Sequence, residues 1–173
     1  TGLLFLEAVL DQAAGEARGE AVEPLPAGQV VQDAVDAFAE RAQGKGMRLD
    51  LQLEPGLLVR GQRLALGHVL QNLLSNAVKY APSGSVVTVK ALARGEKARF
   101  LVIDQGPGIP EAEQGDLFRR FAKLSSQPTG GESSTGLGLS LAKQKARAMG
   151  GDLWYDPAPS GGACFTLEMP RVP

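Results

Sequence analysis

The sequence has little of what covalent cross-links and membrane spans require. Its 173 residues include one cysteine, Cys164, which excludes an intrachain disulfide and a cysteine-based metal cluster. This sparing use of cysteine suits a reducing compartment, so we expect a cytoplasmic location. The most apolar run near the start, Leu3 to Leu10, is broken by Glu7 and is far shorter than a bilayer span. We expect any membrane anchor to lie outside this sequence.

Excess positive charge is also missing. The formal net charge is −1 and aromatic residues make up 5% of the chain, with no run of Lys and Arg interleaved with aromatics. The long-range attraction that drives nonspecific binding to nucleic acid is therefore absent, and we expect no nucleic-acid partner. The hydrophobic content of 43% over 173 residues is enough for one packed core.

The pattern of apolar residues divides the chain into three parts. Residues 1–19 are interpreted as the end of a helix that packs on another helix, because apolar residues recur there at steps of three and four. Residues 20–28 include Pro24 and Pro26 and are interpreted as a linker. Residues 29–173 form the main domain.

Within the main domain, helical and strand periodicities are mixed without strict alternation. Helices are expected over 30–44, 62–80, 111–117 and 136–149, and strands over 47–53, 85–93, 98–103, 152–155 and 163–169. This order predicts the α+β class, as a two-layer α/β sandwich in which helices cover one face of a mixed, mostly antiparallel sheet.

One predicted helix, over 62–80, carries two neighbouring stripes. Leucines form an apolar stripe, and beside it lies a polar stripe of His68, Asn72, Asn76 and Lys79. Amide oxygens can bind a hard divalent cation, and a lysine ammonium can pair with phosphate, so this stripe could hold both. The alternative is an ordinary solvated face.

A second candidate is the segment DQGPGIP, Asp104 to Pro110, which directly follows a predicted hydrophobic strand. A carboxylate here can accept a hydrogen bond from an amine, while the nearby glycines let a flat ring approach the backbone. Adenine offers such an amine and guanine offers a carbonyl, so Asp104 would select adenine. The alternative is a Gly/Pro turn with a capping aspartate.

A third candidate is the segment STGLGLSLAKQK, in which Gly136 and Gly138 precede a helix and could present backbone amides to phosphate. The preceding loop, 125–135, is rich in Ser, Thr and Gly, as a mobile lid would be. Phe118 and Phe121, taken alone, indicate packing on the core. The helix cations Lys143, Lys145 and Arg147 are expected on a solvated face.

Taken in order, four segments resemble the N, G1, F and G2 boxes of sensor histidine kinases. They are NLLSNAVKY (Asn72 to Tyr80), DQGPGIP (Asp104 to Pro110), LFRRF (Leu117 to Phe121) and TGLGLS (Thr135 to Ser140). The resemblance implies the catalytic, ATP-binding domain of that family, with a Bergerat-type fold, and implies that residues 1–19 end its dimerisation helix.

The resemblance also implies roles for single residues. Asn76 matches the family's Mg²⁺ ligand, with Asn72 assisting, and these two residues together with Lys79 match its catalytic positions. Lys79 and Tyr80 match residues near the phosphates and the nucleoside, and Asp104 matches the adenine-reading aspartate. Further positions that match the ATP site are Gly106, Gly108, Ile109, Phe118, Phe121, Thr135, Gly136, Leu137, Gly138 and Leu139.

The family transfers the ATP γ-phosphate to a histidine on the dimerisation helix, works as a homodimer, and passes the phosphate to the receiver domain of a response regulator. Related ATPases carry a glutamate where this chain has Asn72, and that carboxylate activates water for hydrolysis. Because an amide cannot take a proton from water, we expect transfer to an outside nucleophile rather than hydrolysis. The sole histidine, His68, is followed by Val69 rather than an acidic residue, so we do not expect it to be the acceptor. The alternative function is a catalytically inactive nucleotide-binding or pseudokinase module.

Overall fold

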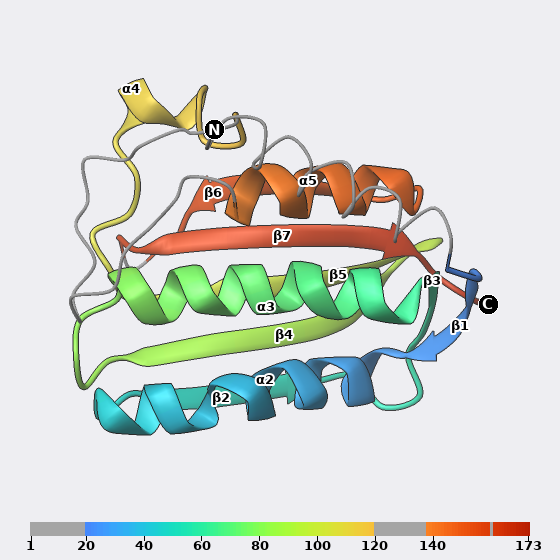
Figure 1. Ribbon diagram of the computed structural model, residues 1–173, viewed down its shortest axis with the longest axis horizontal. Coiled ribbons are helices and arrows are strands. Elements are labelled where there is room, and N and C mark those ends of the chain that lie inside the picture. The colour runs from blue at the N-terminus through green and yellow to red at the C-terminus, as the bar shows by residue number, and fades with distance from the viewer. Residues whose placement is uncertain (1–19, 120–137, 160) are drawn as a thin grey trace, which may run out of the picture.

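The structure, a computed structural model, describes residues 20–119, 138–159 and 161–173, and it is a two-layer sandwich (Figure 1). Its helices are α2 (Ala27–Gly44), α3 (Arg63–Tyr80), the short α4 (Glu111–Gln114) and α5 (Gly138–Ala148). Its strands are β1 (Glu23–Pro26), β2 (Arg48–Leu53), β3 (Leu58–Gly61), β4 (Val86–Arg94), β5 (Lys97–Ile103), β6 (Asp152–Pro157) and β7 (Ala163–Pro170). In the described ranges, none of the helices has both the length and the apolarity to cross a membrane.

The main sheet has the strand order β2-β4-β5-β7-β6. Strands β2 and β4 are parallel, and the remaining neighbours are antiparallel. The hairpin between β4 and β5 closes with Arg94 opposite Lys97, around Gly95 at φ 61°, a conformation that favours glycine. The predicted mixed, mostly antiparallel sheet is therefore confirmed.

The helices α2, α3 and α5 lie side by side on one face of the sheet, with α3 in the middle (Figure 1). Alternate residues of the central strands, such as Val89 and Phe100, are buried beneath them. The predicted apolar stripe of α3 is buried as well, and its members are Leu66, Leu70, Leu73 and Ala77. Because this stripe packs inward, the polar stripe beside it is left near the surface.

Residues 20–28 differ from the expected linker. Glu23–Pro26 form β1, which pairs antiparallel with Leu58–Gly61 (β3), and Leu25 is fully buried. The sequence did not indicate either strand, because each has four residues and β1 contains two prolines, which are tolerated mainly at sheet edges. Residues 1–19 lie outside the described ranges, so the domain boundary near residue 19 stays a prediction.

Glu20 caps the start of α3 from a distant part of the chain. Its carboxylate accepts hydrogen bonds from the backbone N–H groups of Leu64 at 2.7 Å and Ala65 at 3.3 Å. Its carbonyl oxygen accepts a hydrogen bond from the Gln62 side chain at 2.6 Å. Gln62 precedes the helix but makes no capping bond with its own side chain. Glu20 therefore satisfies backbone donors that the helix itself leaves unpaired.

Replacing Glu20 with alanine should lower the melting temperature by about 2–4 °C, because a lost N-terminal cap costs about 1 kcal/mol. Glu23→Ala is the matched control, since Glu23 makes only an exposed ion pair with Arg63 at 3.5 Å. Calorimetric melting of both variants checks the cap. Equal shifts for the two variants would contradict it.

Candidate functional site

A pocket open to solvent lies beside the C-terminal half of α3. Its lining residues are Asn76, Tyr80, Asp104, Pro107, Gly108, Ile109, Ala163 and Phe165. They come from α3, from the segment after β5 and from the start of β7. Five of the residues predicted from sequence thus line one pocket.

Asp104 is the buried charged group of this pocket, with 5% of its surface exposed. Its Oδ1 accepts hydrogen bonds from the backbone N–H groups of Gly106 at 2.8 Å and Ala163 at 3.2 Å. Burial raises the pKa of this carboxyl group, although the two backbone hydrogen bonds oppose that effect. Within the described part of the chain, Oδ2 accepts no hydrogen bond. A ligand in the pocket could therefore donate to it.

Glycines allow the backbone to close tightly around Asp104. A Cβ on Gly162 would lie 2.0 Å from the Asp104 carbonyl oxygen, and a Cβ on Gly106 would lie 3.2 Å from the Tyr80 carbonyl oxygen. Gly108 has φ 73°, and its Cβ would meet the Gly161 carbonyl oxygen at 2.9 Å. The sequence indicated Gly106 and Gly108, but it did not indicate Gly162.

Two aromatic residues of the site were missed by sequence reasoning. Tyr155 and Phe165 are cross-strand neighbours on β6 and β7, and their ring centroids lie 5.4 Å apart. The Tyr155 hydroxyl oxygen accepts a hydrogen bond from the Ile109 N–H at 3.0 Å. The Phe118 ring meets Phe165 edge-on, with centroids 6.2 Å apart. Their strands were recognisable, but the pairing register that places Phe165 in the pocket lining and Tyr155 beside it was not.

The polar stripe of α3 connects this pocket with the start of α5. All four predicted members are half-buried, and Asn76 lines the pocket. Asn72 lies next to Gly138, the first residue of α5. A Cβ built on Gly138 would be 3.7 Å from the Asn72 Oδ1. Lys79 is not among the lining residues. Leu139 is partly buried against the core.

Several predicted positions lie outside the described residues, namely Phe121, Thr135, Gly136, Leu137 and the expected lid over 125–135.

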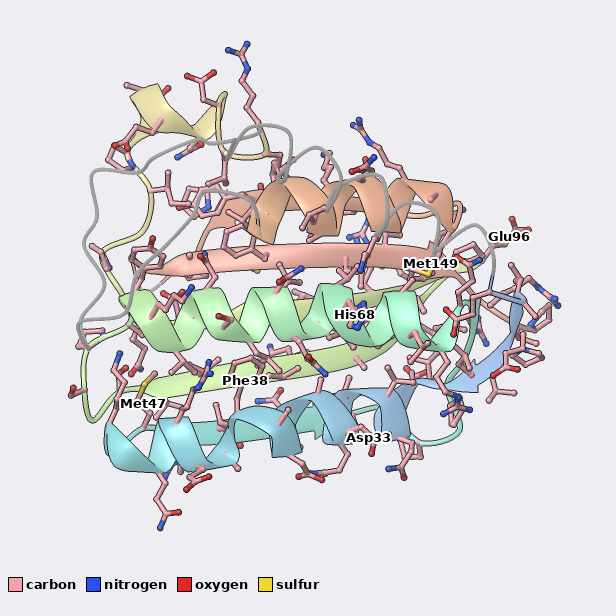
Figure 2. The ribbon with its side chains drawn as sticks, viewed as in Figure 1. Asp33, Phe38, Met47, His68, Glu96 and Met149 are labelled. Atoms are coloured by element: carbon pink, nitrogen blue, oxygen red, sulfur yellow. The ribbon has the colours of Figure 1, made fainter. Side chains whose placement is uncertain are left out.

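The expectation of a fully solvated cationic face on α5 was wrong for two residues. Lys145 is 7% exposed, and its Nζ lies 2.8 Å from Nδ1 of His68, which projects from α3 (Figure 2). The sequence could not reveal this pair, because its members lie 77 residues apart and meet only when the two helices pack. Lys143 is mostly buried too, whereas Arg147 is exposed as predicted.

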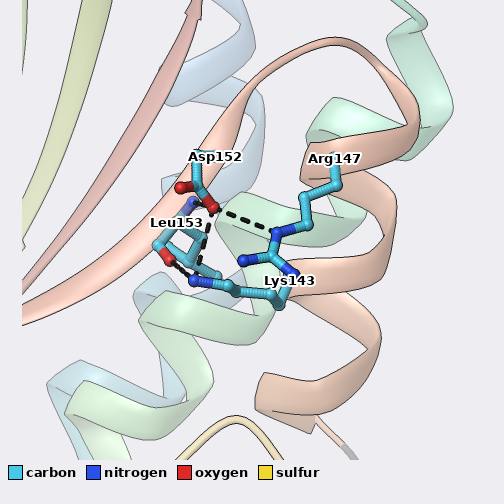
Figure 3. Close-up of polar contacts among 4 residues, drawn as sticks. All are labelled: Lys143, Arg147, Asp152 and Leu153. Atoms are coloured by element: carbon cyan, nitrogen blue, oxygen red, sulfur yellow. Dashed lines mark hydrogen bonds and ion pairs between the residues drawn. The ribbon is translucent and has the colours of Figure 1, made fainter.

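Asp152, at the start of β6, pairs with two cations of α5, Lys143 and Arg147 (Figure 3). Its Oδ1 lies 3.3 Å from Lys143 Nζ and 3.4 Å from Arg147 Nε, and it accepts a hydrogen bond from the Leu153 N–H at 2.8 Å. Partial burial works against ionisation, but that hydrogen bond and the two cations outweigh it, so the pKa of Asp152 is lowered.

Residues 61–173 match the family of histidine kinase-, DNA gyrase B- and HSP90-like ATPases. The chain belongs to this family. The match spans the elements from the end of β3 onward and so includes every lining residue of the pocket. Together with the relatives and solved structures described next, this match confirms the resemblance to the catalytic, ATP-binding domain of sensor histidine kinases.

Curated relatives support the same family. The sensor histidine kinase TmoS of Ectopseudomonas mendocina is 35% identical over 130 residues, which is 75% of this chain and 13% of TmoS. The signal transduction histidine-protein kinase AfsQ2 of Streptomyces coelicolor is 40% identical over 125 residues, 72% of this chain and 23% of AfsQ2. The chain therefore spans less than a quarter of the length of these two relatives.

Solved structures share the fold. The mycobacterial sensor histidine kinase MprB superposes with a TM-score of 0.79 at 29% identity, covering 87% of this chain and 99% of that one. Full-length ShkA in complex with AMPPNP superposes with a TM-score of 0.77 at 24% identity, covering 88% and 32%. The predicted α/β sandwich with helices on one face is confirmed.

Replacing Gly162 with alanine should lower the melting temperature by at least about 5 °C, because its Cβ would overlap the Asp104 carbonyl group. Gly115→Ala is the control, since Gly115 has φ −65° and open space around it. Thermal melting of both variants is the measurement. A Gly162→Ala chain as stable as the control would show that the close approach is not required.

Proposed function

We propose that this chain is the catalytic domain of a sensor histidine kinase, which binds Mg-ATP and transfers the γ-phosphate to a histidine on the dimerisation helix. The observation that carries the proposal is the Asp104 carboxylate, which is buried in the pocket with one oxygen fixed by backbone amides. The family match and the names of the relatives support it.

The chemistry of the pocket favours adenine. The exocyclic amine of adenine can donate a hydrogen bond to Asp104, whereas guanine would turn a carbonyl oxygen toward a carboxylate. The absence of side chains at Gly106 and Gly108 leaves their backbone open to a flat ring. This supports ATP rather than GTP as the nucleotide.

The polar stripe of α3 supports binding of a metal and of phosphate. Asn76 and Asn72 would hold Mg²⁺ through their amide oxygens, which are the hard ligands this ion prefers. The bound ion would neutralise negative charge on the phosphates. Lys79 would pair with phosphate oxygens, and the N-terminus of α5 at Gly138 lies beside Asn72 and would offer backbone amides.

The same residues favour transfer to an outside nucleophile over hydrolysis. Asn72 has no basic group to activate water, so positioning and charge neutralisation would carry the catalysis. His68 contacts Lys145 where α3 meets α5, which supports an acceptor histidine elsewhere. That acceptor would lie on the dimerisation helix of a homodimer, from which a response regulator receives the phosphate in the cytoplasm.

Asp104→Asn should weaken binding of Mg-ATP about 10- to 100-fold, as expected for a lost hydrogen bond to a charged group. The raised pKa of Asp104 means that its charge costs stability at neutral pH, and that this cost disappears on acidification. The variant should therefore melt no lower than the unchanged chain at pH 7. Titration calorimetry measures the affinity, and unchanged affinity would remove Asp104 from the site.

The transfer reaction itself tests the proposal. The chain joined to its full dimerisation helix should take up label from γ-labelled Mg-ATP, and the label should be lost in acid and survive base. Asn76→Ala should reduce this labelling to background, because the variant loses the proposed metal ligand. Tight ATP binding without any label would favour the inactive nucleotide-binding module, and full labelling of the variant would contradict the role of Asn76.

A further inference from the structure

Lys143 on α5 lies where three parts of the fold meet. Its Nζ donates a hydrogen bond to the Leu153 carbonyl oxygen on β6 and lies 3.3 Å from Oδ1 of Asp152 (Figure 3). The same Nζ lies 4.7 Å from the centroid of the Phe118 ring, just beyond α4. The Lys143 side chain is only 19% exposed, so these contacts are largely shielded from water.

The Phe118 ring lies between the Lys143 ammonium group and the lining of the nucleotide pocket. It packs at right angles to the ring of Phe165, and Phe165 is a lining residue of the pocket along with Asp104 and Asn76. Phe165 in turn packs on Tyr155, whose hydroxyl group holds the backbone of Ile109. Phe118 is thus a second layer behind one wall of the pocket.

The Lys143 ammonium group can make all three of these contacts at once. It has three donors, and two partners from β6 hold it while its charge is attracted to the face of an aromatic ring. Because Asp152 and Leu153 fix Nζ from the β6 side, the cation is held in place over Phe118. Arg147 pairs with the same carboxylate but is 64% exposed.

We propose that Lys143 is a positioning residue of the nucleotide site, which holds Phe118 against Phe165 and so fixes one wall of the pocket. This inference rests on the proposed function, namely that the pocket binds ATP. The competing possibility is that Lys143 only fastens α5 to β6, in which case nucleotide affinity would not depend on it.

The test measures binding of Mg-ATP to the 173-residue chain by titration calorimetry. Lys143→Met keeps the aliphatic stem and removes the charge, and it should weaken affinity about fivefold, in keeping with a partly shielded cation–π contact. Lys143→Arg keeps a cation and should remain within about twofold of the unchanged chain. Arg147→Gln, the matched control, loses an ion pair to Asp152 and should bind normally.

A double-mutant cycle then separates positioning from fastening. If Lys143 acts through Phe118, adding Lys143→Met to Phe118→Leu should cost less than about twofold further affinity. Unchanged affinity of Lys143→Met, or losses that multiply in the double variant, would overturn the inference. If Lys143→Met does not melt cooperatively, Lys143→Gln replaces it in the cycle, because it also removes the charge and retains a hydrogen-bond donor.

The failures of the two proposals are distinguishable. If the unchanged chain does not bind Mg-ATP, the proposed function falls, and the inference falls with it. If the unchanged chain and Lys143→Met bind equally tightly, the proposed function stands and the inference alone is overturned.

Discussion

The geometry of the site depends on one buried carboxylate. Asp104 follows β5, and two backbone amides from different parts of the chain fix its Oδ1. To make this possible, the loop before β7 approaches so closely that Gly162 has no room for a side chain. Burial penalises the charge and raises the pKa of this carboxyl group, and groups with such shifts are frequent in functional sites.

The central helix α3 joins this carboxylate to the rest of the site. One side of it packs in the core, and the other brings Asn76 to the pocket and Asn72 to the first residue of α5. Glu20 caps its first turn, and Lys45 donates to the carbonyl oxygen of Val78 in its last turn. The polar side chains are therefore presented by an element that is fixed at both ends.

Much of the fold and of the candidate site could be predicted from local sequence. The stripes on α3 follow from helical spacing, and the place of Asp104 follows from a hydrophobic strand that ends in a Gly/Pro segment. Features that depend on tertiary pairing could not be predicted in this way. The register of β6 with β7 places Tyr155 against Phe165, which lines the pocket, and the pair of Lys145 with His68 requires two packed helices.

The most direct test of the central claim compares purine nucleotides that have and lack an amine at position 6 of the base. The affinities of the unchanged chain for Mg-ATP, Mg-GTP and the triphosphate of purine riboside, which lacks the exocyclic amine, should be measured by titration calorimetry. If the Asp104 carboxylate reads adenine, ATP should bind at least about tenfold more tightly than either analogue. Equal affinity for all three would show that the carboxylate does not recognise the base.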